Sequence, residues 1–415
     1  MDKHVVLSQT ESKRPRFFYG YVVALAAFFT TLVMSWSLAS YGVFFKPLAT
    51  EFGWTRAMTA GALSLSLFVF GLLSMVTGRL TDRFGPRLVA TVCGSILSLG
   101  YLLMSRINDG WQLYLFYGVI IAVGQSGGFV PMMSTVARWF VKKRGLMNGI
   151  VVAGIGVGIV IMPPVATHLI ATYGWRTSYG IIGIITLVLL IGAAQFLKRD
   201  PNQIGHLPDG DKDTKPESTV PVTKGYTLGE ALHTRQFWML CATYFCYGFF
   251  VQPIIVHIVP HATDLGISTM TAASILSVIG GLSIAGRIGI GSGGDRIGHK
   301  PALVIAFLIA VIAMVLLLVA REVWMFYLFA VIFGFAYGGL IAIESPMTAQ
   351  LFGLRAHGAI LGVVHFHATI GNAIGLPFAG KLFDLNGNYQ LAFLVFVGLS
   401  GVGLILVSLL RPIKK

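Results

Sequence analysis

A lone arginine, Arg287, lies inside a glycine-rich apolar stretch at residues 280–291, eight residues before Asp295. Eight residues of helix span about 12 Å, since each residue adds about 1.5 Å. A guanidinium can bind a carboxylate through two parallel hydrogen bonds. The sequence therefore predicts that Arg287 anchors an organic anion. The alternative is a structural ion pair, and Glu344 is the acidic residue placed well inside a helix that could form it.

Histidines could titrate beside such an anchor, because the pKa of an ordinary imidazole lies near neutral pH. His257, His365 and His367 all fall in apolar segments and are candidates for carrying a proton. We expect His257 first, because its segment is equivalent to the first apolar segment of the chain. Each of the three could instead be a hydrogen-bonded packing residue.

Aromatic and amide side chains in the apolar segments are candidates for lining a cavity around the anchor. Such side chains on membrane helices also serve as packing residues, and their spacing does not separate the two roles. The candidates are Tyr117, Gln125, Tyr247, Tyr337 and Asn372, and His257 is expected to bind substrate with them.

Other kinds of chemistry lack the residues that they need. The sequence contains no Gly-Lys-Ser/Thr loop for nucleotide phosphates and no evident pairing of a nucleophile with a base. Cys93, Cys241 and Cys246 show neither metal-ligand spacing nor a disulfide framework. We therefore expect no ATP-driven pump, no enzyme, no metal and no cofactor.

The composition places these residues in a membrane. Hydrophobic residues make up 55% of the 415 positions and charged residues only 11%, too few to cover a soluble protein of this size. A bilayer core about 30 Å thick needs roughly 20 apolar residues per helix. The sequence predicts twelve such helices, at residues 18–46, 56–78, 87–106, 111–138, 145–172, 175–198, 235–260, 268–294, 300–320, 322–350, 356–383 and 388–411.

The net charge of +14 comes from basic residues in alternate loops rather than from one aromatic-rich surface. This pattern argues against a nucleic-acid partner and instead reports topology. We expect a multi-pass protein of the cytoplasmic membrane, with the lipid bilayer around it and both termini in the cytoplasm. We also expect the first helix to remain as an anchor. The sequence points to no particular oligomeric state.

A degenerate repeat divides the chain. The decapeptide at residues 78–87 recurs 213 positions later at 291–300, and the same shift aligns Gly145 with Gly358 and Pro164 with Pro377. Six predicted helices fit in each copy, so we expect parallel repeats with a site between them. The predicted units are a six-helix bundle at 1–198, a polar cytoplasmic linker at 199–230 and a second bundle at 231–415.

The repeated decapeptide resembles the signature loop between helices 2 and 3 of the major facilitator superfamily, with its echo between helices 8 and 9. The resemblance implies the twelve-helix fold of that family, an all-α membrane protein of two pseudo-symmetric bundles. In that family the loop steadies the outward-open form. The implied gate residues are Gly78, Asp82, Arg83, Gly85 and Arg87, with Asp295 and Arg296 in the second copy.

A second block points to one branch of this superfamily. Residues 138–158, the pair Pro163 and Pro164, and residues 173–176 resemble helices 4 to 6 of the monocarboxylate transporter family and of the bacterial oxalate/formate antiporter group. In both groups the arginine matching Arg287 binds the substrate carboxylate. The resemblance therefore implies that Arg287 has the same role.

Departures from the two groups narrow the substrate. Many animal monocarboxylate transporters carry an aspartate and a lysine for proton relay where this chain has Ser283 and approximately Ala39. Oxalate exchangers carry a second cation, a lysine on helix 11, and the expected eleventh helix of this chain has no lysine at mid-depth. One permanent charge suits one carboxylate. We expect secondary active transport of a short monocarboxylate such as lactate, pyruvate or propionate by proton symport. The alternatives are an organic-anion antiporter, a carboxylate sensor without transport and, last, a channel.

Overall fold

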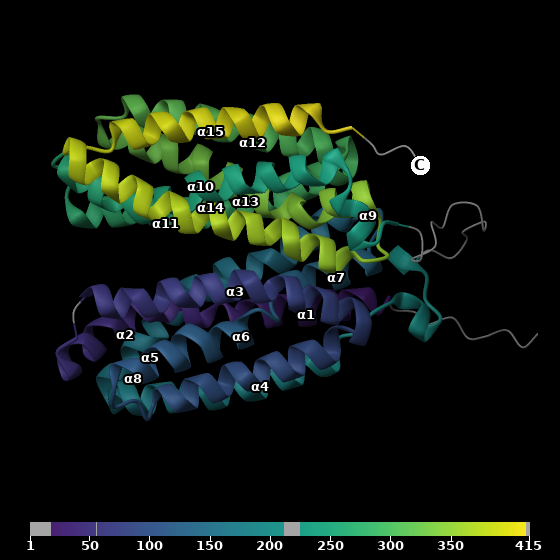
Figure 1. Cartoon of the computed structure of the whole chain (residues 1–415), viewed down its shortest axis with the longest axis horizontal. Helices are drawn as coiled ribbons and strands as arrows, with labels where there is room; N and C mark the ends of the chain where they lie inside the picture. The colour runs from purple at the N-terminus through teal and green to yellow at the C-terminus, as the bar shows by residue number, and fades with distance from the viewer. Residues whose placement is uncertain (1–17, 55, 211–224, 412–415) are drawn as a thin grey trace, which may run out of the picture.

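The computed structural model describes residues 18–54, 56–210 and 225–411 (Figure 1). The expected basic start at Lys13–Arg16 and residues 211–224 of the expected linker lie outside this described part. The described chain is almost wholly helical. Its helices are α1 Gly20–Met34, α2 Trp36–Phe52, α3 Arg56–Phe84, α4 Pro86–Met104, α5 Gly110–Leu113, the π-helical turn η1 Tyr114–Ile121, α6 Ala122–Gln125, α7 Phe129–Trp139, α8 Arg144–Gln195, the 3₁₀ turns η2 Pro201–Ile204 and η3 Pro208–Gly210, α9 Leu228–Leu232, α10 Arg235–Asp264, α11 Thr269–Ile297, α12 His299–Val319, α13 Val323–Phe352, α14 His357–Asn386 and α15 Gln390–Leu409.

Eleven helical spans of the described chain are long and apolar enough to cross a membrane. One of these spans, helix α8, is long enough to contain two membrane helices. Helix α8 has 52 residues, which corresponds to about 78 Å of helix at 1.5 Å per residue. Gly174 interrupts it with non-helical backbone angles of φ 75° and ψ 162°, a conformation that glycine adopts readily. The two segments on either side of Gly174 are the expected fifth and sixth membrane helices, so the twelve-helix prediction is confirmed.

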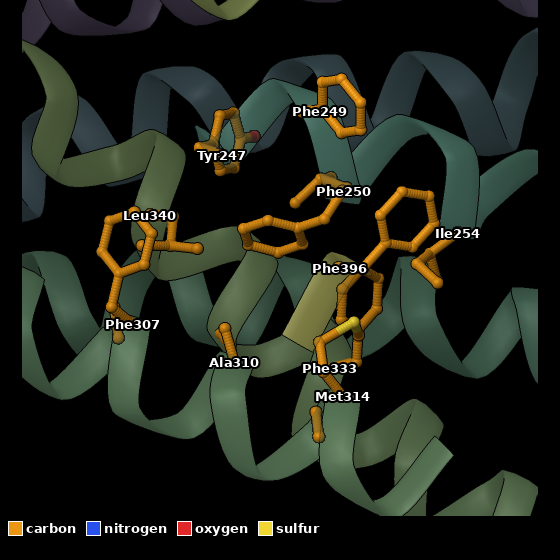
Figure 2. Packing of buried hydrophobic residues seen from close by; sticks show 14 of the residues in the cluster. Tyr247, Phe249, Phe250, Ile254, Phe307, Ala310, Met314, Phe333, Leu340 and Phe396 are labelled. Carbon is orange, nitrogen blue, oxygen red and sulfur yellow. The ribbon is translucent and has the colours of Figure 1, made fainter. Parts of the chain in front are cut away.

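The helices form two bundles that lie against each other along their length (Figure 1). One hydrophobic core runs through the second bundle, from Ala231 to Leu410. Phe250 of α10, Phe333 of α13 and Phe396 of α15 belong to it (Figure 2). The first bundle has a separate core between Leu32 and Leu190. Each half therefore buries its own apolar side chains.

Glycines bring the two bundles into backbone contact at two equivalent places. A Cβ atom at Gly78 of α3 would lie 2.2 Å from the carbonyl oxygen of Gly358 in α14, and a Cβ at Gly145 of α8 would lie 2.2 Å from that of Gly291 in α11. Shifting by 213 residues converts the first pair into the second. The bundles thus meet through α3 with α14 and through α8 with α11, as a two-fold axis between them requires.

The described parts of the segment between the bundles lie at one end of the molecule, which we call the linker end (Figure 1). The carboxylate of Asp209 accepts hydrogen bonds from the backbone amides of Val141 and Lys142 at 2.9 and 2.8 Å. Gly225, on the far side of residues 211–224, forms an isolated β-bridge with Gly353. One stretch of this segment is therefore attached to the first bundle and the other to the second.

Candidate functional site

Asp82 joins the two bundles at the linker end. It lies near the end of α3 and accepts hydrogen bonds from the first backbone amides of α14, those of Gly358 at 3.1 Å and Ala359 at 2.9 Å. Arg138 of α7 donates to the same carboxylate at 2.8 Å. A carboxylate is favourable at a helix N-terminus because the unpaired amides there carry partial positive charge. Asp82 therefore meets both a helix N-terminus and a basic partner.

Asp295 makes the equivalent contact in the opposite direction. Its carboxylate accepts hydrogen bonds from Gly145 at 2.6 Å and Leu146 at 2.8 Å, in the first turn of α8. Leu351 stands 213 positions after Arg138, so this second contact lacks the matching arginine. The two aspartates close the linker end crosswise, each binding a helix of the other bundle.

The other expected gate residues divide into backbone and surface positions. Gly78 is packed against Gly358, as described above, and Gly85 has a φ of +86° between α3 and α4. Arg83, Arg87 and Arg296 are exposed. In the described contacts Arg87 donates a hydrogen bond to the side chain of Gln195, within its own bundle.

A cavity of about 510 Å³ lies between the bundles. Helices α1, α2, α3, α6, α7 and α8 supply its lining from the first bundle, and α10, α13 and α14 from the second. Most of its wall is apolar. Its polar lining includes Gln125, Tyr247, Tyr337, Asn372 and His365, all named from the sequence, together with Gln252 and several hydroxyl groups.

Three expected cavity residues point elsewhere. Tyr117 is buried in the first bundle, where its hydroxyl donates to the carbonyl of Ser37 at 2.8 Å. His257 lies 3.2 Å from the Tyr389 hydroxyl, within the second bundle. The ring of His367 lies edge-on to Trp238, an exposed residue. None of the three is part of the cavity wall, because each occupies a helix face directed away from the other bundle or toward its own core.

Arg287 is 1% exposed and lies just behind that wall. Its Nη1 donates to the carbonyl of Val152 in α8 at 3.3 Å, across the interface between the bundles. Its guanidinium carbon lies 5.6 Å from the ring centroid of Tyr337. Tyr337 lines the cavity and Arg287 does not, so the guanidinium lies against a residue of the cavity wall without being part of that wall.

The guanidinium of Arg287 has unused bonding capacity. Its buried Nε has no hydrogen-bond partner, and no acid forms an ion pair with it among the residues that the structure describes. Leaving a buried charged donor unpaired is costly. Because none of the described ion pairs includes Arg287, the alternative expected from the sequence, an ion pair between Arg287 and Glu344, is not formed in this conformation.

Glu344 instead pairs with His365. The imidazole Nδ1 lies 3.3 and 3.4 Å from the two carboxylate oxygens. The side chain of Glu344 is 1% exposed and that of His365 is 14% exposed, because His365 reaches the cavity and Glu344 lies behind it. The His365 ring stacks on Phe129 of α7, with a centroid distance of 4.4 Å.

Sequence reasoning missed this pair, although one signal was present. Glu344 lies eight residues before the end of α13 at Phe352, and His365 lies eight residues after the start of α14 at His357. The two helices are joined by a short turn, so equal spacing from that turn places both residues at the same depth.

A family model matches most of the chain. The model described as Major Facilitator Superfamily matches residues 27–321 and 290–415. The chain belongs to the major facilitator superfamily. It is accordingly a multi-pass membrane transporter and not an enzyme.

Several curated relatives within the superfamily are monocarboxylate transporters. Monocarboxylate transporter 13 of Rattus norvegicus is 26% identical over 392 residues, which is 91% of this chain and 85% of the relative. Monocarboxylate transporter 2 of Homo sapiens is 26% identical over 91% of this chain and 82% of its own. An uncharacterized MFS-type transporter of Escherichia coli K12, YhjX, is 28% identical over 77% of this chain and 81% of its own.

Solved structures share the fold at lower identity. The Escherichia coli fucose:proton symporter superposes with a TM-score of 0.71 at 16% identity, over 94% of this chain and 99% of the symporter. The human organic anion transporter MFSD10 gives a TM-score of 0.69 at 16% identity, over 94% of this chain and 99% of its own. These likenesses confirm the fold predicted from the sequence.

Proposed function

We propose that this member of the major facilitator superfamily moves a short monocarboxylate together with a proton, by alternating access between its two bundles. The observation that carries the proposal is Arg287, a buried guanidinium beside the central cavity with no acidic partner in the described chain. The similarity to monocarboxylate transporters supports the same substrate class. Lactate, pyruvate and propionate are the simplest members of that class.

The proposed cycle begins with the linker end closed by Asp82 and Asp295. We propose that this end faces the cytoplasm, with both termini, and that the membrane is the cytoplasmic membrane. The anion enters the cavity from the opposite side and displaces the Tyr337 ring. It then replaces the carbonyl of Val152 as the partner of Arg287. Loss of that contact between bundles favours their rocking, which exposes the anion to the cytoplasm.

His365 is the histidine best placed to carry the coupled proton. It lines the cavity, whereas His257 and His367 do not. An imidazole in contact with cavity water can exchange protons with it. The bound anion and the bound proton then lie in the same region of the molecule.

The first test replaces Arg287 by glutamine in purified protein reconstituted into empty liposomes. Uptake of labelled lactate or pyruvate, driven by an inward proton gradient, should fall by about 100-fold, because each hydrogen bond to a charged group is worth about 1.5–3 kcal/mol. Arg321→Gln is the matched control, since Arg321 is exposed at the opposite end, and it should transport normally. Near-normal uptake by Arg287→Gln would remove this residue from the substrate site.

The same vesicles separate symport from exchange. Uptake into empty vesicles that follows the proton gradient supports symport. Strict dependence on preloaded internal anion would instead establish an antiporter of organic anions. Saturable binding of the monocarboxylate without transport into the vesicles would instead indicate a carboxylate sensor.

A further inference from the structure

Glu344 is a buried acid whose only described ion-pair partner can be neutral. A carboxylate beside a neutral imidazole leaves one uncompensated negative charge in the apolar interior, and such a charge is costly. Adding one proton to the pair gives either an imidazolium with a carboxylate or a neutral acid with a neutral imidazole. Both forms have no net charge. The geometry of Glu344 and His365, at 3.3 and 3.4 Å, thus suits the binding of one proton.

The groups that face this pair carry no fixed charge, and one fixed charge lies beyond them. Cys241, Tyr244 and Tyr247 of α10 interact electrostatically with Glu344. Phe129 and Phe70 face His365 from α7 and α3. Tyr247 also interacts electrostatically with Arg287 of α11 and with Tyr337 of α13, the helix of Glu344 itself. The tyrosines and the cysteine are neutral near pH 7, so Arg287 is the one permanent cation among these neighbours.

The charges of Arg287 and Glu344 can be summed for each loading state. The empty carrier, with the arginine positive, the glutamate negative and the histidine neutral, has no net charge at this depth. A bound carboxylate adds one negative charge, and a bound proton removes it. Carriers loaded with the anion alone or the proton alone each keep one net charge in the interior, where a charge is expensive.

We propose that Glu344 and His365 together form the proton-binding site of the carrier, and that Glu344 makes the empty carrier neutral so that it can return without substrate. This proposal rests on the proposed monocarboxylate function. A proton from cavity water enters at Nε2 of His365, the proton on Nδ1 is then shared with the Glu344 carboxylate, and one proton leaves to water on the other side. Anion and proton move together because only their joint binding restores neutrality.

The proposal predicts a change of transport mode for Glu344→Gln. The variant has a neutral form when loaded, since the anion compensates Arg287, but its empty form keeps the arginine charge. Loaded carriers can therefore exchange anion for anion, whereas empty carriers return slowly. Net uptake of labelled lactate into empty vesicles under a proton gradient should fall by about 100-fold. Exchange of labelled for unlabelled lactate at equal pH should stay within about threefold of the parent protein.

His365→Gln and His367→Gln form a matched pair of further variants on α14. His365→Gln keeps the charge balance of Arg287 and Glu344, so net uptake should persist while its pH profile shifts by about one unit or more. His367→Gln should leave the profile unchanged, because His367 lies outside the cavity wall. These variants also test the proposal if Glu344→Gln does not yield folded protein.

The outcomes separate the two proposals. If the parent protein neither takes up nor exchanges monocarboxylates, the proposed function fails. If the parent protein couples uptake to protons and Glu344→Gln keeps gradient-driven net uptake, the function stands and the proton site is wrong. An unchanged pH profile in His365→Gln would likewise overturn the assignment of this pair.

Discussion

Arg287 and Glu344 are opposite charges buried in one bundle that do not bind each other in this conformation. Each would cost roughly 2.5–3.5 kcal/mol at the centre of a membrane helix without compensation. The guanidinium is partly compensated by the Val152 carbonyl and the face of Tyr337, and the carboxylate by His365. Separation of the two charges leaves each available for a mobile partner, an anion for one and a proton for the other.

The sequence revealed Arg287 but not the state of its neighbours. Its position in an apolar stretch predicted burial, which the structure shows. The sequence could not predict which histidine faces the cavity, because α14 is apolar around most of its circumference and has no polar stripe that would indicate its orientation. His365 and His367 are two residues apart, about 200° around a helix, so only the packing of α14 against α3 and α10 decides which one reaches the cavity.

At the same residue scale, the two aspartates of the linker end should differ in strength. Asp82→Asn should favour opening of that end more than Asp295→Asn, because Arg138, a buried arginine of the same bundle, holds the Asp82 carboxylate in position for its contact with α14. Loss of hydrogen bonds to a charged acceptor should shift the equilibrium by about 2 kcal/mol, or about 30-fold, for Asp295→Asn, and further for Asp82→Asn. Spin labels on cysteines placed at Phe84 and Ile297 would report the distance between the bundles.

The three native cysteines are buried, so the introduced cysteines should label selectively. Asp264→Asn, at the opposite end of α10, is the control and should leave the distance distribution unchanged. Equal shifts for Asp82→Asn and Asp295→Asn would show that Arg138 does not contribute to closure.

At the scale of helices, glycines let the backbones of the two bundles approach closely. A Cβ at Gly149 of α8 would lie 2.2 Å from the backbone oxygen of Arg287 in α11. The equivalent Gly362 of α14 would bring a Cβ to 2.8 Å from Cα of Met75 in α3. Such contacts let pairs of membrane helices approach without intervening side chains.

Gly149→Ala should therefore weaken closure of the linker end. The added methyl group meets backbone, which cannot rotate away, and overpacking of this kind costs about 1–3 kcal/mol. The spin-label distance described above should shift toward open forms. Gly180→Ala is the control within the same helix, because nothing lies within 4 Å of its added Cβ. A closed population as large as that of the parent protein would mean that α8 and α11 can separate without opening this end.

Element identities were largely predictable, and their boundaries less so. The apolar stretches and the repeat predicted the helices because a bilayer requires both length and hydrophobicity. The sequence placed the sixth helix at residue 175, and the backbone break is at Gly174. It did not reveal that α1 and α2 are separated at Ser35 or that a π-helical turn follows α5, because local backbone changes leave the apolar pattern intact.

At the scale of the whole molecule, the proposed cycle moves no net charge. One anion and one proton cross together, and the empty carrier returns neutral. A single net charge would change the driving force by about 2.3 kcal/mol per 100 mV, equivalent to about 50-fold in accumulation. We expect a potassium diffusion potential of about 100 mV to alter lactate accumulation less than twofold at constant pH gradient.

The voltage experiment has its own control in the same vesicles. Collapse of the pH gradient by a proton-exchanging ionophore should abolish accumulation whether or not a potential is present. A strong response to voltage would contradict the one-to-one loading of anion and proton. The division into units at 1–198, 199–230 and 231–415 stays a prediction, although each half has its own hydrophobic core.

The crossed contacts of Asp82 and Asp295 have the form of an isologous interface. In a homodimer with two-fold symmetry, each subunit offers the same acid to the same helix of its neighbour. Here both subunits belong to one polypeptide, and the described contacts keep that reciprocity through the 213-residue shift. Arg138, whose counterpart is Leu351, breaks the equivalence. The contact of Asp82 with α14 and the contact of Asp295 with α8 therefore differ in strength and can break one after the other. The molecule can then open asymmetrically, at one of the two contacts before the other.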